Sequence, residues 1–76
     1  MEFEKVREII VDVMNVTEDD VTMDTAFVDD LGADSLDIFQ IIVGIEDKFD
    51  IEIDNDDVES IVTVEDAIEK IKNALN

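Results

Sequence analysis

The sequence predicts an all-α protein: a small four-helix bundle with three longer helices, one short helix and a long loop between helices 1 and 2. Apolar residues recur at helical spacing in three separate stretches. The 76 residues include no Cys and no His, so disulfides and the usual zinc ligands cannot support the small core, and well-capped helices are the economical solution. A hydrophobic content of 46% is too high for a disordered acidic chain. We therefore expect one folded domain over residues 1–76.

The first helix is predicted over residues 2–15. Its apolar residues share one face: Phe3, Val6, Ile10 and Val13, flanked by Ile9 and Met14. The segment is rich in β-branched residues, which favour strands, but its apolar positions do not alternate as those of a half-buried strand do. A helix is therefore favoured over a strand.

Residues 16–35 have no lasting periodicity and are expected to form a long loop. Phe27 and Leu31 should anchor this loop to the core, and Thr17 can cap a short turn. A connection of about 20 residues often marks a functional segment, although a chain that crosses the molecule between distant helices needs the same length. The loop contains seven acidic residues and no basic one: Glu18, Asp19, Asp20, Asp24, Asp29, Asp30 and Asp34.

The helix predicted over residues 36–50 has two apolar faces. At about 100° per residue, one sector holds five residues that we assign to the core: Ile38, Ile41, Ile42, Ile45 and Phe49. The opposite sector holds Leu36, Phe39 and Val43. Because so short a chain has little protein left to cover both faces, we expect the second face to be exposed for a partner. Gly44 weakens a helix by about 1 kcal/mol relative to Ala, which a close helix crossing would explain.

The last third of the chain is predicted to contain a short helix and a longer one. Two isoleucines alternate with acids in residues 51–54, but no second strand exists to pair with them, so an extended link is expected. Residues 55–61 can form one or two helical turns. Thr63 and Asp66 have the spacing of a capping box at the start of the last helix. The amphipathic stripe of that helix is expected to consist of Val64, Ala67, Ile68, Ile71 and Leu75.

The charge and composition exclude several classes of function. With 5 basic and 23 acidic residues the net charge is −18, which repels phosphate backbones and anionic lipids, so neither nucleic-acid binding nor membrane insertion is expected. No stretch approaches ~18 uninterrupted apolar residues and no signal peptide opens the chain, so we expect a cytoplasmic protein. Without His or Cys the usual general base and thiol nucleophile are missing, so neither an enzyme nor a catalytic residue is expected. The expected state is a monomer that binds basic protein surfaces.

The acidic loop meets the two-faced helix in the run Asp29-Asp30-Leu31-Gly32-Ala33-Asp34-Ser35-Leu36. In a purely structural interpretation, Asp34 or Ser35 caps the helix and Gly32 supplies a turn residue. A nucleophile elbow does not fit, because Gly-x-Ser-x-Gly is not matched and no His can activate the hydroxyl. Ser35 is instead a good acceptor for a group that another enzyme attaches.

This run resembles the attachment motif of acyl carrier proteins. The resemblance rests on Asp34-Ser35-Leu36, preceded by Asp30-Leu31-Gly32-Ala33 and followed by Asp37, and it extends over essentially the whole chain. It includes the length, the acidity, Phe27, Glu46-Asp47, Phe49-Asp50 and Thr63-Val64. The chain departs from the commonest pattern of the family at Gln40, which replaces an acid, at Lys48, which interrupts an acidic helix end, and at Asp54, which replaces a frequent Pro. The first two departures bear on partner preference, and none touches the attachment motif.

The resemblance implies one acyl-carrier domain over residues 1–76. It implies that a phosphopantetheinyl transferase attaches 4′-phosphopantetheine from coenzyme A to Ser35, with Asp34 and Leu36 beside the attachment point. Fatty acyl chains are then held as thioesters on the terminal thiol and delivered to fatty-acid synthesis enzymes and acyltransferases with basic surfaces. The implied partner-binding residues are Leu36, Asp37, Phe39, Gln40, Val43, Glu46 and Asp47.

Other interpretations remain open. Within the carriers, the alternative is a D-alanyl or peptidyl carrier domain. Outside them, a non-catalytic acidic adaptor that docks its exposed apolar face into a basic groove explains everything except the surroundings of Ser35. The acid clusters suggest calcium, but no EF-hand loop fits, because from Asp50 the required Gly is Asn55 and the twelfth position is Ile61. No specific metal site is therefore expected.

Overall fold

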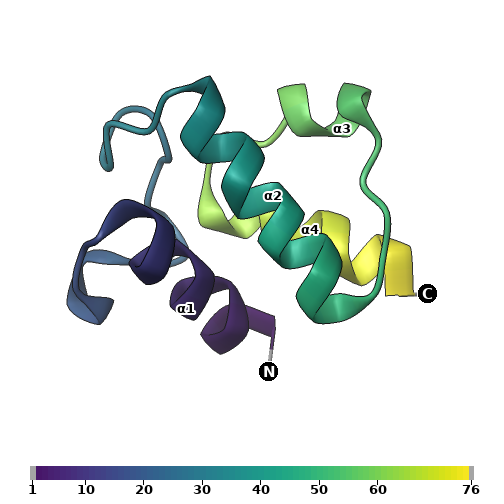
Figure 1. The fold of residues 1–76 in the computed structure, drawn as a ribbon, viewed down its shortest axis with the longest axis horizontal. Helices are drawn as coiled ribbons and strands as arrows, with labels where there is room; N and C mark the ends of the chain where they lie inside the picture. Colours follow the sequence, from purple (N-terminus) through teal and green to yellow (C-terminus); the bar gives the residue numbers. More distant parts are fainter. Residues whose placement is uncertain (1, 76) are drawn as a thin grey trace.

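A computed structural model describes residues 2–75 as a small all-helical protein (Figure 1). Its elements are α1 (Glu2–Met14), the 3₁₀ turn η1 (Glu18–Asp20), α2 (Ser35–Phe49), α3 (Asn55–Glu59) and α4 (Val64–Leu75). In Figure 1, α2 crosses the front of the molecule, with α1 to its left, α3 to its upper right and α4 behind it. Three helices are long, one is short, and a long loop joins α1 to α2, so the predicted fold class is confirmed.

The core consists of branched aliphatic side chains from the three long helices. The largest fully buried side chains are Val6, Ile10, Ile41, Ile45, Val64 and Ile71. Helical spacing assigned these residues to core faces, and burial confirms all three faces. Leu75 is the exception: it is 52% exposed, because it lies one turn beyond Ile71, the last buried residue of α4. Leu75 therefore belongs to the predicted apolar stripe of this helix but lies outside the core.

Helices α1 and α2 cross closely at Gly44. A β-carbon at this position would lie 2.9 Å from Cγ2 of Ile9, well inside the ~3.5–4.0 Å at which carbon atoms pack best. Only glycine lets the two helices approach this far without a shift. This contact is the close helix crossing that explains a glycine inside the second predicted helix.

The long loop is held at several points. Asn15 ends α1 with a left-handed conformation (φ 56°). The short turn η1 forms where it was predicted, with Thr17 as its N-cap residue, and the backbone N–H and the hydroxyl of Thr17 both donate to Oδ2 of Asp20, at 3.2 and 3.0 Å. Phe27 is buried and Leu31 is half-buried against the core. Both predicted anchors of the loop are therefore confirmed.

An isolated β-bridge ties the loop to the segment that precedes α4. Ala26 pairs with Thr63, and backbone hydrogen bonds of 3.0 Å flank the pair on both sides. No sequence pattern predicted this contact, because a single bridge between distant segments has no periodicity. Residues 51–54 form no strand, as predicted.

Carboxylates stabilise several backbone turns. Oδ2 of Asp66 accepts hydrogen bonds of 3.0 Å from the N–H groups of both Thr63 and Val62, and the Thr63 hydroxyl accepts from the N–H of Asp66 at 3.2 Å. This is the predicted capping box. The N–H groups of Thr63 and Val62 hold the pKa of Asp66 below its ordinary value, because they favour the charged form. Asp30 similarly accepts from the N–H of Ala26 at 2.7 Å.

Basic side chains link neighbouring helices. Nζ of Lys48 lies 3.3 Å from Oε2 of Glu8 and joins α2 to α1, and Nζ of Lys70 lies 3.3 Å from Oδ1 of Asp57 and joins α4 to α3. Ion pairs this exposed contribute about 0–1 kcal/mol each. They orient the helices, whereas the buried aliphatic side chains supply most of the stability.

Candidate functional site

Ser35 is the first residue of α2 and is exposed at the end of the long loop. Its neighbours cap the helix. The N–H of Asp37 donates to Oδ1 of Asp34 at 2.9 Å, and the N–H of Asp34 donates to Oδ2 of Asp37 at 3.2 Å. Of the two predicted caps, Asp34 takes the role. The hydroxyl of Ser35 is therefore not needed as the cap and stays at the surface.

The turn before Ser35 is fixed by backbone geometry. Gly32 has a φ of +67°, in the left-handed region that glycine adopts without a steric cost. The next residue, Ala33, is buried, and its N–H donates to the carbonyl of Phe27 at 2.9 Å. Together these residues hold the end of the loop against the core and direct Ser35 outwards.

The exposed apolar face of α2 is where the sequence predicted it. Leu36 and Phe39 are each 62% exposed and Val43 is 44% exposed. Gln40 and Asp47 are also exposed. These residues form a surface next to Ser35 that has apolar side chains and an acidic end.

Two of the predicted rim acids have structural contacts as well. Asp37 is half-buried and forms the capping box with Asp34. Glu46 is half-buried, and its Oε2 accepts a hydrogen bond of 2.8 Å from the N–H of Ile53. The spacing of acids along a helix does not reveal the Glu46 contact, because it depends on where the following loop runs. Asp47 is the rim acid with an exposed side chain.

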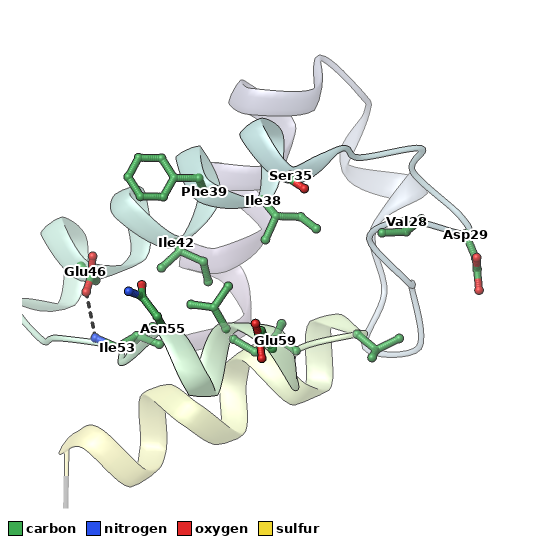
Figure 2. Close-up of a pocket in the computed structure, with 13 residues that line it drawn as sticks. Val28, Asp29, Ser35, Ile38, Phe39, Ile42, Glu46, Ile53, Asn55 and Glu59 are labelled. Atoms are coloured by element: carbon green, nitrogen blue, oxygen red, sulfur yellow. Dashed lines mark hydrogen bonds between the residues drawn. The ribbon is translucent and has the colours of Figure 1, made fainter.

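A cavity of about 550 Å³ opens beside Ser35 (Figure 2). Its walls are mostly apolar and come from both sides: Ile38, Phe39 and Ile42 on α2, and Ile53, Val58 and Ile61 on and around α3. Figure 2 shows Ser35 on the side towards Val28 and Asp29, and the bonded pair Glu46 and Ile53 at the opposite end. An exposed hydroxyl beside an apolar cavity fits a long covalent group whose apolar end enters the protein.

The sequence did not predict this cavity, because Ile38 and Ile42 were assigned to the core. One signal was present in the sequence: Ile53 and Val58 are the apolar residues of the polar, mostly acidic segment 52–59. That segment is too short to form a core of its own, so its apolar residues have to face another element.

Among residues 2–75, no group of three or more His, Cys, Asp or Glu side chains is arranged to hold a metal ion. Within the same range, every helix is too short or too polar to cross a membrane.

Comparisons with known proteins identify the family. A family profile described as "Phosphopantetheine attachment site" matches residues 4–71. An acyl carrier protein from Sulfurovum sp. (strain NBC37-1) is 51% identical over 71 residues, which cover 93% of this chain and 95% of that relative. The chain belongs to the acyl carrier proteins. Acyl carrier proteins are carriers that bear phosphopantetheine, so the expected cofactor and the expectation of a non-enzyme are confirmed.

Solved structures agree with this assignment. A protein from Mycobacterium tuberculosis superposes with a TM-score of 0.89 at 36% identity, over 96% of this chain and 97% of that chain. The acyl carrier protein from Enterococcus faecalis superposes with a TM-score of 0.80 at 34% identity, over 96% and 92% of the two chains. The helical fold of this acyl carrier protein is thus shared over nearly its whole length.

Proposed function

We propose that the chain carries fatty acyl groups as thioesters on a 4′-phosphopantetheine arm attached to Ser35 and delivers them to fatty-acid synthesis enzymes. Residues 1–76 act as one carrier domain in the cytoplasm. The observation that carries the proposal is the position of the Ser35 hydroxyl, exposed at the start of α2 beside an apolar cavity of about 550 Å³.

The phosphopantetheine arm, the first turn of α2 and the cavity have different roles in the carrier. Phosphopantetheine supplies a terminal thiol, which a chain without Cys lacks. Asp34 and Asp37 fix the first turn of α2, so that Ser35 is presented in a constant position. The apolar walls of the cavity shield an acyl chain from water, at about 0.8 kcal/mol for each buried methylene group.

The partners in this proposal are enzymes with basic surfaces around an apolar pocket. A net charge of −18 attracts such surfaces at long range and speeds encounter. Leu36, Phe39 and Val43 then supply the contact that excludes water. The phosphopantetheinyl transferase is the first of these partners, because it has to reach the Ser35 hydroxyl.

The cavity favours a fatty acyl chain over the other carrier cargoes. A D-alanyl group is small and carries an ammonium charge, which is costly to place against apolar walls without a partner. A peptidyl group would bring unpaired backbone polar atoms into the same walls. An adaptor protein needs neither the cavity nor an exposed serine.

Intact-protein mass spectrometry tests the attachment site. After incubation with coenzyme A and a phosphopantetheinyl transferase, the wild type should gain the mass of one phosphopantetheine, and Ser35→Ala should gain none. Ser60→Ala is the matched control, because Ser60 is the only other serine and its hydroxyl donates to the carbonyl of Asp57. Labelling of Ser35→Ala at the wild-type level would overturn the assignment.

Thermal melting tests the cargo. Octanoyl loaded on the arm should raise the melting temperature above that of the holo form, because the chain fills the apolar cavity. D-alanyl loaded in the same way should not. Equal melting temperatures for the two loaded forms would remove the support that the cavity gives to fatty acyl cargo.

A further inference from the structure

Glu46 and Ile53 line the end of the cavity that lies away from Ser35. Figure 2 shows Glu46 and Ile53 joined by a hydrogen bond across the end that lies away from Ser35. At about 1.5 Å per residue, α2 places Glu46 roughly 16 Å along its axis from Ser35. An acyl chain that enters beside Ser35 and runs along α2 therefore reaches Glu46 and Ile53 at the far end of the cavity.

Glu46 organises the segment that forms this end. Its main-chain carbonyl accepts from the N–H of Asp50, which has the left-handed conformation, and from the N–H of Ile51 at 3.1 Å. Its side chain then reaches further and accepts from the N–H of Ile53 at 2.8 Å. The side chain of Ile53 lines the cavity, so this last bond fixes a wall residue.

Apart from the packing of Ile53 and Val58 against the core, few contacts hold that wall in place. Helix α3 has five residues, none of them buried, and its N-cap residue Asp54 makes no hydrogen bond with its side chain. The ion pair between Asp57 and Lys70 has side chains that are 48% and 30% exposed, so solvent weakens it. Besides the apolar packing of Ile53 against the core, its hydrogen bond to Glu46 is therefore the main polar contact that positions it.

We infer that Glu46 sets the length of the acyl chain that the cavity accepts, an inference that rests on the proposed function. An acyl chain that extends past Ile53 has to break the hydrogen bond that the N–H of Ile53 donates to Glu46. It would then leave a backbone donor and a carboxylate without partners against an apolar chain, which is unfavourable. Glu46 is thus a specificity-determining residue in addition to its place at the rim of the exposed face.

A chain-length series tests this inference. The wild type and three variants are loaded with even-numbered saturated chains from hexanoyl to hexadecanoyl, and loading at Ser35 is verified by mass. The melting temperature of each form is compared with that of the acetyl-loaded form of the same variant. In the wild type the gain in melting temperature should increase with acyl-chain length and then stop increasing at a limiting length. In Glu46→Ala the limiting length should increase by at least one step of the series.

Two variants separate the hydrogen bond from the charge. Glu46→Gln keeps an oxygen acceptor at the same reach and should keep the wild-type limit. Glu46→Asp keeps the charge, but its side chain is one methylene too short to reach the N–H of Ile53, so its limiting chain length should shift as in Glu46→Ala. This variant replaces Glu46→Ala in the test if the alanine variant folds poorly. Asp47→Ala is the matched control, since Asp47 is the exposed neighbour and does not line this cavity.

The outcomes are distinguishable. An unchanged limit in both Glu46→Ala and Glu46→Asp would overturn the inference, as would a limit in Glu46→Gln that shifts with that of the alanine variant. A wild-type gain that continues to rise up to hexadecanoyl would show that the cavity has no fixed end, and would also overturn it. Absence of any loading at Ser35 would overturn the proposed function itself.

Discussion

The two faces of α2 have similar apolar residues and opposite environments. On the inner face, Ile41 and Ile45 are 1% and 0% exposed, whereas Leu36 and Phe39 on the outer face are each 62% exposed. Both faces have helical spacing, so periodicity alone does not tell a core from a binding surface. What separates them is the amount of protein available to cover them. In a chain of 76 residues, a helix with two apolar faces indicates that one of them belongs to a partner.

The acids around the outer face show a second contrast. Asp37 and Glu46 turn back to backbone N–H groups of their own chain, while Asp47 is exposed. A reversal of charge at Asp37 or Glu46 would therefore disturb the fold as well as the recognition of enzymes. Asp47 is the position where charge can be varied with the least structural effect.

The largest effect is expected when a core residue is compared with an outer-face residue. Ile45→Ala should lower the free energy of unfolding by about 2–5 kcal/mol, because it leaves a cavity among fully buried side chains. Val43→Ala, two positions away on the outer face, should change it by about 0.5 kcal/mol or less. Urea denaturation measures both. Similar losses in the two variants would contradict the division of α2 into two faces.

A smaller effect is expected where α1 meets α2. Gly44→Ala adds a carbon 2.9 Å from Cγ2 of Ile9, and overpacking costs about 1–3 kcal/mol, offset by about 1 kcal/mol of helix propensity. A net loss of about 1 kcal/mol is expected. In an Ile9→Ala background the clash is absent, so the same substitution should be stabilising. Destabilisation of equal size in both backgrounds would show that the contact is not the cause.

The smallest effect concerns the capping box of α4. The pKa of Asp66 is lower in the folded protein than in the unfolded chain, so its contribution to stability is complete above the unfolded value of about 3.9 and is lost as the pH falls through the folded value. Asp66→Asn should therefore be less stable than the wild type at pH 7, and the difference should shrink below about pH 4. Asp24→Asn, in the exposed part of the loop, controls for the removal of one charge. Chemical denaturation across this range measures the difference, and a constant gap would contradict the proton linkage.

The helices could be predicted because their signals are local. The predicted ranges 2–15 and 36–50 agree with α1 and α2 to within one residue at each end. The capping box of α4 could be predicted for the same reason, since Thr63 and Asp66 are only three positions apart in the sequence. The exposed face of α2 followed from periodicity combined with chain length.

The features that escaped prediction depend on contacts between distant segments. The bridge from Ala26 to Thr63 and the bond from Glu46 to Ile53 join elements whose relative position no local pattern specifies. The cavity exists because α3 lies away from α2 rather than packed into it, which the composition of either segment does not reveal. The exposure of Leu75 reflects where the neighbouring helices end, again a property of the assembled fold.

One measurement tests the division of α2 most directly: the kcat/KM of a phosphopantetheinyl transferase on the apo form of Phe39→Ala, with the melting temperature of the same sample. Loss of a buried contact of about 1–2 kcal/mol in the enzyme complex should lower kcat/KM by about 5–30-fold, while the melting temperature stays close to that of the wild type. Leu75→Ala, which truncates another apolar residue that is more than half exposed, at the end of α4, should leave both values unchanged. A collapse of the melting temperature of Phe39→Ala, or an unchanged kcat/KM, would contradict the account.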